Sequence, residues 1–188
     1  MGKLYILGIS GSLRAGSFNR MALSLAGELM PENMVLEVEE WREFPIYDED
    51  TQASGIPPAV QTFADRVRHS DAVLFATPEY NFSLPGGLKN AIDWVSRIDS
   101  QPFAEKPVAL LSASAGPLGG ARVQYDLRRV MMSLNAMMMG RPEVFIGSAQ
   151  TKFDLGGGCC TDDATRGFVA AQMVAFERWI RYVKAGQR

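Results

Sequence analysis

The sequence predicts an α/β fold in which helices cover both faces of an open parallel sheet. Five short apolar segments alternate with five amphipathic segments along the chain. Most of the apolar segments are continuous rather than alternating, which is typical of parallel strands buried on both sides. Loops rich in glycine and serine follow three of these segments, at the points where a predicted strand leads into a helix.

The predicted strands are short runs with few polar residues. They cover residues 3–9, 34–40, 71–77, 107–113 and 142–147. The second run contains the alternation Leu36, Glu37, Val38, Glu39. Alternating apolar and polar residues suit a strand with one solvated face. We therefore expect the second strand at an edge of the sheet.

Between the strands, apolar residues recur at the spacing of helices with one buried face. These patterns cover residues 18–29, 60–67, 88–95, 123–134 and 169–183. Strands joined through right-handed helical crossovers form a parallel sheet. An edge position for the second strand favours a five-stranded, flavodoxin-like sheet of order 2-1-3-4-5. Ligands of such sheets bind beyond the carboxyl ends of the strands, which here lead into residues 10–19, 77–87 and 112–120.

Length and charge limit the class of protein. The chain has 188 residues and is expected to form one domain over residues 1–188. Its net charge of −2 argues against general nucleic-acid binding, which needs a basic surface. No apolar run reaches the roughly 18–20 residues of a membrane span. Two adjacent cysteines form no disulfide framework, so a cytoplasmic location is expected.

The first glycine- and serine-rich loop is suited to a phosphate. It joins the first strand to the first helix, where unpaired N–H groups and the helix dipole favour an anion. Ser10, Ser12, Ser17 and Asn19 supply hydrogen-bond donors, and Arg14 adds a positive charge. The alternative is an ordinary turn with Ser17 as the N-cap. That alternative leaves Arg14 and the density of donors unexplained.

The second and third loops are suited to a planar ring. Residues 77–87 contain a Pro-Glu-Tyr-Asn tip, in which Tyr80 offers an aromatic surface, and residues 112–120 are again small and rich in donors. A phosphate on the first loop and a heterocycle between the other two describe flavin mononucleotide (FMN). The single histidine, His69, is expected to end a helix away from this edge, and no group of metal ligands is recognisable.

Three segments, "GSLRAGSFN", "PEYNFSLPGGLKNAIDW" and "GPLGGAR", resemble the NADPH-dependent FMN reductase family. Members of this family include quinone, azo-dye and chromate reductases. The resemblance covers residues 4 to about 154 and implies one FMN per subunit, NADPH or NADH as donor, and homodimers or homotetramers. The residues implied in cofactor binding are Ser10, Ser12, Arg14, Ser17, Phe18, Asn19, Pro78, Glu79, Tyr80, Asn81, Ser112, Ser114 and Gly116. No protein side chain is expected to be catalytic, because flavin N5 is the reactive atom.

Several points stay open from the sequence. Many members of the family have glycine where this chain has Phe82, so the size of the electron acceptor does not follow from the resemblance. A flavodoxin-type electron carrier is the alternative function, and a nucleotide-binding regulatory domain without flavin is a second. Trp94 and Phe103 are candidates for contacts between subunits. Methionines near residues 131–139 suit the core or an interface, and Cys159 and Cys160 are expected to be incidental.

Overall fold

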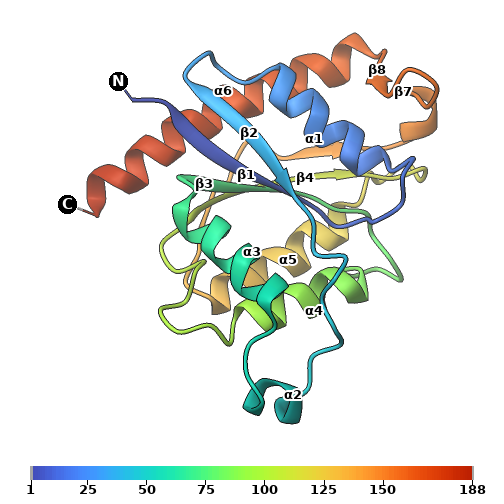
Figure 1. Ribbon diagram of the computed structural model, residues 1–188. Helices are drawn as coiled ribbons and strands as arrows, with labels where there is room; N and C mark the ends of the chain where they lie inside the picture. The colour runs from blue at the N-terminus through green and yellow to red at the C-terminus, as the bar shows by residue number, and fades with distance from the viewer. Residues whose placement is uncertain (1, 188) are drawn as a thin grey trace.

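The structure, a computed structural model, describes residues 2–187 and contains a six-stranded parallel sheet (Figure 1). The sheet has the order β2-β1-β3-β4-β5, and β6 also pairs with β4. The predicted flavodoxin-like order is therefore confirmed, with β2 at an edge. The strands of the sheet are β1 (Leu4–Ser10), β2 (Met34–Glu39), β3 (Ala72–Ala76), β4 (Pro107–Ala113), β5 (Met137–Met138) and β6 (Val144–Ile146).

Six α-helices and one short 3-10 helix accompany these strands within residues 2–187. The α-helices are α1 (Phe18–Glu28), α2 (Glu49–Ala53), α3 (Pro58–His69), α4 (Gly86–Val95), α5 (Ala121–Ser133) and α6 (Asp163–Gly186), and the 3-10 helix is η1 (Ala149–Thr151). Each of the five predicted helices is present. His69 ends α3 as predicted, and its exposed ring contacts the Asp65 carbonyl at 2.7 Å.

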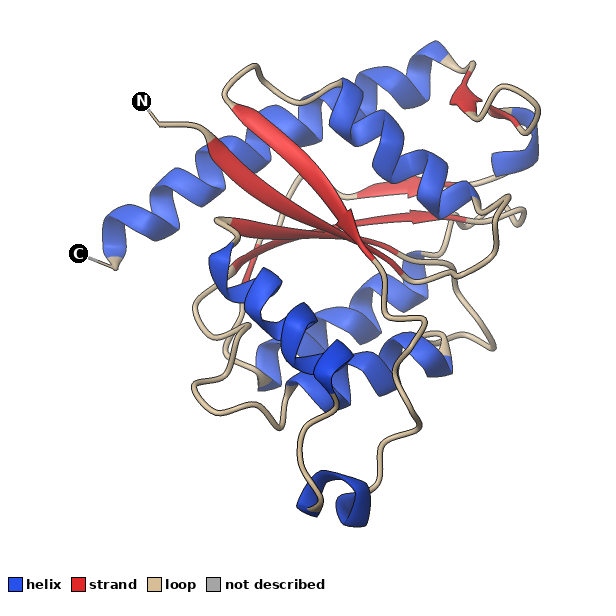
Figure 2. Ribbon diagram, in the orientation of Figure 1, coloured by secondary structure: helices blue, strands red, loops and turns tan. Residues whose placement is uncertain are grey.

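Helices cover both faces of the sheet (Figure 2). A hydrophobic core lies on each face. On one face α1 and α6 pack over Ile6, Leu74 and Leu111. On the other, α3, α4 and α5 pack over the intervening strand residues, including Phe75 and Leu110. Successive side chains of a strand point to opposite faces, so continuous apolar strands supply both cores. No helix within residues 2–187 is long and apolar enough to cross a membrane.

The fifth strand differs from the prediction for residues 142–147. Two short strands pair with β4 where one was predicted. β5 pairs with Pro107 and Val108, and β6 pairs with the segment from Leu111 to Ala113. Pro142 lies between the two pieces. A proline has no N–H to donate to a strand ladder, which explains why pairing resumes only at Val144.

Two segments expected to be loops contain regular structure. In the acidic segment 41–55, the side chain of Asp48 accepts a hydrogen bond from the Thr51 N–H and caps α2. In the segment 154–163, β7 (Phe153–Asp154) pairs with β8 (Cys159–Cys160) in an antiparallel hairpin. The Asp154 carboxylate accepts hydrogen bonds from the N–H groups of Gly156 and Gly157, both at 2.9 Å. Short polar side chains thus fold both segments locally.

The expectation that Trp94 and Phe103 contact another subunit is wrong. Both side chains are fully buried in the core beneath α4. The Trp94 ring donates its N–H to the Pro45 carbonyl at 2.9 Å and packs edge-on against Tyr47. Met131 and Met139 are buried in the core, as expected for methionines at helical spacing, whereas Met132 is exposed.

Candidate functional site

Three loops meet at the carboxyl edge of the sheet, at the switch between β1 and β3. Backbone hydrogen bonds continue between neighbours just past the strands, from Gly11 to Ala76 at 2.8 Å and from Thr77 to Leu111 at 3.1 Å. A β-carbon on Gly11 would lie 2.2 Å from the Thr77 hydroxyl oxygen. Only glycine therefore allows the first and second loops to approach so closely.

The first loop, residues 10–19, is folded by its own serines. The Ser10 hydroxyl donates to the Ser12 carbonyl at 3.0 Å and accepts from the Ser12 N–H at 3.2 Å. Ser17 is the N-cap of α1, and its hydroxyl accepts the Asn19 N–H at 3.2 Å. No acidic residue lies in the first turn of α1, so no side-chain anion there offsets the positive end of the helix dipole.

Arg14 projects from this loop into solvent. Within residues 2–187 its guanidinium takes part in no hydrogen bond or ion pair, in contrast to the nearby Arg42, which donates to the Leu13 carbonyl at 2.7 Å. The loop therefore presents an uncommitted positive charge beside the N-terminus of α1. This combination suits a phosphate.

The second loop ends in a tight hairpin turn. Tyr80 and Ser83 exchange two backbone hydrogen bonds, both 3.0 Å long. The two residues between them, Asn81 and Phe82, have φ angles of +50° and +68°. Positive φ at both central positions is the pattern of a type I′ turn, in which glycine or asparagine is favoured. Tyr80 and Phe82 are 51% and 68% exposed at the tip of this turn.

An ion pair ties the second loop to the start of α5. The Glu79 carboxylate accepts hydrogen bonds from the Arg122 guanidinium at 2.7 Å and from the Arg122 N–H at 3.1 Å. The same guanidinium lies 4.1 Å from the centre of the Phe82 ring, within the range of a cation–π contact. Arg122 therefore holds both the strained aromatic residue and the acidic residue of the turn.

The third loop, residues 112–120, packs tightly against the end of β6. Gly119 has a φ of +61°, and a β-carbon there would lie 2.6 Å from the carbonyl carbon of Phe145. The Ser114 N–H donates to the Ile146 carbonyl at 3.0 Å. At the outer end of the loop, Gly116 and its neighbours are exposed. The loop is thus anchored at its base and accessible at its tip.

The side chains of two predicted site residues, Asn19 and Ser112, form hydrogen bonds inside the protein. The Asn19 side chain bridges to β4, donating to the Ala113 carbonyl and accepting from the Ala113 N–H, both at 2.9 Å. The Ser112 hydroxyl is fully buried and accepts a hydrogen bond from Gln124 at 2.8 Å. Both residues lie behind the loops, where they fix the position of the backbone. Of the predicted set, Arg14, Tyr80, Asn81 and Gly116 are exposed at the edge.

Trp41 and Arg122 support the loops without having been predicted in the site. The Trp41 ring N–H donates to the Ser10 carbonyl at 2.8 Å, and a β-carbon on Gly87 would lie 2.6 Å from the same ring. Trp41 therefore packs between the first loop and the start of α4. Its position after an edge strand gave no sequence signal, whereas Arg122 lies within the recognised "GPLGGAR" segment.

The three loops fit a phosphorylated planar cofactor. One loop combines a free guanidinium with a helix N-terminus, and the other two leave an exposed aromatic ring and small exposed residues along the same edge. In doubly wound sheets this switch point is the usual binding position for a nucleotide or a flavin. The fold and the loops together define an FMN-binding α/β oxidoreductase.

The comparison with protein families agrees with this class. Residues 4–151 match the model of the NADPH-dependent FMN reductase family, and this chain belongs to that family. An NAD(P)H-dependent FMN reductase from Pseudomonas aeruginosa is 49% identical over 179 residues, which cover 95% of this chain and 96% of the relative. A quinone reductase from Escherichia coli is 43% identical over 184 residues, covering 97% and 98% of the two chains.

A solved structure shows the same architecture over nearly the full length. The flavoenzyme FerB, an NAD(P)H:acceptor oxidoreductase from Paracoccus denitrificans, superposes with a TM-score of 0.86 at 33% identity. The match covers 95% of this chain and 98% of FerB. A flavodoxin from Pseudomonas aeruginosa, 14% identical with a TM-score of 0.54, shares the fold.

Proposed function

We propose that this protein is an FMN-dependent NAD(P)H oxidoreductase that passes electrons to small oxidised acceptors, with quinones as the first class to test. The observation that carries the proposal is the meeting of three donor-rich loops at the β1–β3 switch point, with Arg14 free beside α1. The quinone and FMN reductases among the relatives support the same activity. Free flavins, azo compounds and chromate are further acceptors within the proposal.

Each loop has a distinct role in the proposal. Arg14, Ser12, Ser17 and the first turn of α1 bind the phosphate, whereas Asn19 and Ser112 hold the loops in register. Pro78, Tyr80 and Asn81 line the ring on one side, and Ser114 and Gly116 approach it on the other. Glu79 positions the turn through Arg122. Backbone N–H groups of the second and third loops stabilise negative charge on a reduced ring.

Bound FMN supplies an acceptor for hydride and a donor of electrons, which is chemistry that protein side chains lack. The protein binds the phosphate, orients the ring and limits access to it. Because Tyr80 and Phe82 are exposed at the tip of one turn, donor and acceptor are proposed to use a single opening in succession. We therefore expect ping-pong kinetics, and a sequential pattern would contradict this part of the proposal.

The first test is a visible absorption spectrum of the purified protein, supplemented with FMN and desalted, before and after anaerobic addition of NADPH. A retained flavin band that bleaches rapidly is the expected result. A retained band that NADPH leaves unchanged would favour the electron-carrier alternative. A protein that retains no flavin would overturn the assignment of the three loops.

A comparison of acceptors follows from that result. The NADPH-reduced protein is mixed anaerobically with a benzoquinone, free FMN, an azo dye or chromate, and return of the flavin band is timed. We expect reoxidation by the quinone to be the fastest of the four. The chain is further proposed to act as a single domain, as a homo-oligomer, and in the cytoplasm, where its free cysteines remain reduced.

A further inference from the structure

The β7–β8 hairpin contacts the first loop on both sides of Ser17, the N-cap of α1. Before the cap, Leu155 approaches Gly16, where a β-carbon would lie 4.0 Å from the Cδ2 atom of the leucine. After the cap, the rings of Phe18 and Phe153 pack with their centres 6.0 Å apart. The hairpin therefore flanks the segment that is proposed to bind the phosphate.

Arg14 and Leu155 border the same residue of this loop. The Nη2 atom of Arg14 lies 3.7 Å from the position of that β-carbon on Gly16, and Leu155 lies close to the same position. The Leu155 side chain is 53% exposed, so it stands in solvent next to the loop instead of filling the core. An apolar side chain is thus adjacent to the positive charge that is proposed to meet the phosphate.

Both strands of the hairpin are anchored. Phe153 in β7 and Cys160 in β8 are buried in the core between the sheet and the layer of α1 and α6. At the base of the hairpin the Thr161 N–H donates to the Lys152 carbonyl at 2.8 Å. Leu155 follows β7 directly. The anchored strands therefore hold Leu155 in a fixed position beside the first loop.

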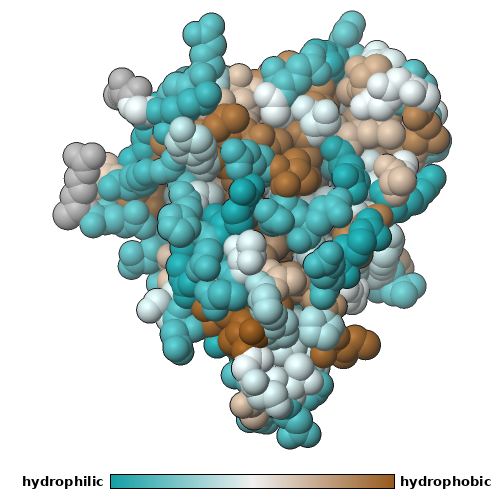
Figure 3. All heavy atoms as spheres, viewed as in Figure 1, coloured by the Kyte–Doolittle hydropathy of each residue, from teal (hydrophilic) through white to brown (hydrophobic). Residues whose placement is uncertain are grey.

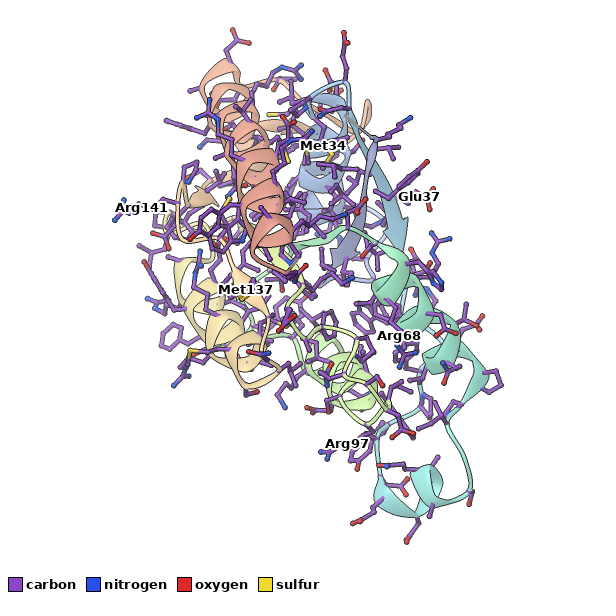
Figure 4. The ribbon with its side chains drawn as sticks, turned by 90° about the vertical axis from the view of Figure 1, so that its left-hand side faces the viewer. Met34, Glu37, Arg68, Arg97, Met137 and Arg141 are labelled. Atoms are coloured by element: carbon purple, nitrogen blue, oxygen red, sulfur yellow. The ribbon has the colours of Figure 1, made fainter. Side chains whose placement is uncertain are left out.

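Figure 3 shows pale and brown atoms gathered at the upper right, where β7 and β8 lie in Figure 1. The surface over β2 and α3 is mostly hydrophilic in the same view. The amino edge of the sheet faces the viewer in Figure 4, with Met34 and Met137 at the starts of β2 and β5. The hairpin lies at the other end of the strands, at the edge that carries the three loops.

The glycine-rich tip of the hairpin has its N–H groups already in use. The N–H groups of Gly156 and Gly157 donate to the Asp154 carboxylate, both at 2.9 Å. The Gly158 N–H donates to the Asp154 carbonyl at 2.8 Å. Glycine-rich loops bind phosphates through such N–H groups, but Asp154 occupies all three of them here. The carboxylate also places a negative charge on the hairpin, which disfavours a second anionic group.

The hairpin and the loops proposed to bind the ring lie on different sides of the first loop. The second and third loops lead into α4 and α5, whereas the hairpin packs with α1 and α6 in the other layer. A flavin whose ring contacts the second and third loops therefore points its phosphate end toward the hairpin. Any group attached beyond that phosphate has to pass Leu155.

We propose, resting on the proposed function, that this hairpin restricts the first loop to a terminal phosphate and that Leu155 sets the restriction. FMN ends at its phosphate, whereas flavin adenine dinucleotide (FAD) continues through a second phosphate to adenosine. That second phosphate meets the Leu155 side chain and the Asp154 carboxylate, and it finds the glycine N–H groups occupied. Obstacles to a larger ligand give specificity in the same way as better contacts with a smaller one. The protein thus selects FMN over FAD.

The test is equilibrium dialysis of wild type and of Leu155→Ser against FMN or FAD. We expect wild type to bind FMN about 100-fold more tightly than FAD, and Leu155→Ser to reduce this preference about tenfold through tighter FAD binding. The matched control is Ile46→Ser, which removes another exposed apolar side chain and should leave the preference unchanged. Circular dichroism checks that both variants are folded.

Asp154→Asn tests the electrostatic part of the proposal. It removes the negative charge and keeps one side-chain oxygen as an acceptor for the tip of the hairpin. We expect the preference for FMN to fall at low salt, and the fall to shrink at high salt because salt screens exposed charges. A fall of the same size at both salt concentrations would contradict the role given to the charge.

Three results would overturn the restriction by Leu155. One is equal affinity of wild type for FMN and FAD, and another is an unchanged preference in Leu155→Ser. The third is an equal loss of FMN and FAD binding in that variant, which would mean that Leu155 only supports the loop. Each of these results leaves FMN binding by wild type intact, and with it the proposed function. A wild type that binds neither flavin would overturn the proposed function itself, so the two failures are distinguishable.

Discussion

Asn19 and Arg14 lie in the same loop and serve different purposes. The Asn19 amide is buried and satisfies both backbone groups of Ala113 across the sheet edge. The Arg14 guanidinium is exposed and forms no bond within residues 2–187. The hydrogen-bonded Asn19 amide stabilises the fold, whereas the unpaired Arg14 guanidinium is available to a ligand. The two substitutions below separate these roles.

Asn19→Ala is expected to reduce the free energy of unfolding by about 2–4 kcal/mol, because it leaves a buried N–H and a buried carbonyl without partners. Urea denaturation followed by circular dichroism measures the loss. Asn33→Ala is the control, since its amide makes one hydrogen bond, to Glu177, at a partly exposed position, and a loss below about 1 kcal/mol is expected there. Equal losses in the two variants would contradict the bridging role of Asn19.

Arg14→Ala is expected to weaken FMN binding by about 10- to 100-fold, the value of one charge-assisted hydrogen bond of about 1.5–3 kcal/mol. Binding of riboflavin, which lacks the phosphate, should be nearly unchanged. Flavin fluorescence titration measures both affinities, and Arg97→Ala provides a control at an exposed arginine just beyond the C-terminal end of α4. An unchanged FMN affinity would exclude Arg14 from the phosphate site.

At the scale of elements, Lys106 joins the end of α3 to the start of β4. Its ammonium group donates to the carbonyls of Arg68 and Ser70 at 3.0 and 2.7 Å. Burial lowers the pKa of Lys106 to about 8, while nearby Asp71 raises this pKa and Lys184 lowers it further. The unfolded chain keeps the ordinary pKa near 10.5. Between these two values the unfolded state binds more protons than the folded state.

The contribution of Lys106 to the free energy of unfolding should therefore increase as the pH rises from about 8 to about 10.5. The increase is at most about 3 kcal/mol, because one pKa unit corresponds to about 1.36 kcal/mol and the lysine keeps some solvent contact. The measurement is the free energy of unfolding of wild type minus that of Lys106→Met across this range, since the subtraction removes other titrating groups. A difference that falls with pH would contradict the assigned direction.

At the scale of the whole molecule, cofactor binding and folding are linked. Loops from β1, β3 and β4 meet at the proposed site, and a ligand that requires all three binds only the folded chain. FMN at 100 times its dissociation constant then adds about 2.7 kcal/mol of stability. For a chain of this length that corresponds to a rise in Tm of about 5–11 °C.

Thermal denaturation at increasing FMN concentration measures this linkage. Riboflavin at the same concentration is expected to give a smaller rise, because it cannot occupy the phosphate loop. Adenosine monophosphate is a second control that supplies a phosphate without an isoalloxazine ring. Equal rises with FMN and adenosine monophosphate would point to a phosphate site without selectivity for flavin.

The sequence alone determined the class of fold and the order of the sheet, and it located the three loops of the proposed site. Continuous apolar runs and the roughly 3.6-residue spacing of amphipathic helices are visible in the sequence, and a loop rich in glycine, serine and arginine between a strand and a helix indicates a candidate phosphate-binding turn. These signals are local. They were sufficient to predict β2 at the edge and FMN as the ligand class.

The tertiary structure decided which side chains are buried and which remain free, because local sequence patterns do not contain that information. Whether Asn19 faces a ligand or Ala113, and whether Trp94 is buried or exposed, depends on segments far away in the sequence. The division of the last strand into β5 and β6, and the support of the first loop by Trp41, likewise depend on distant partners. Periodicity specifies which face of an element is buried, but packing between distant elements determines which atoms remain free to bind.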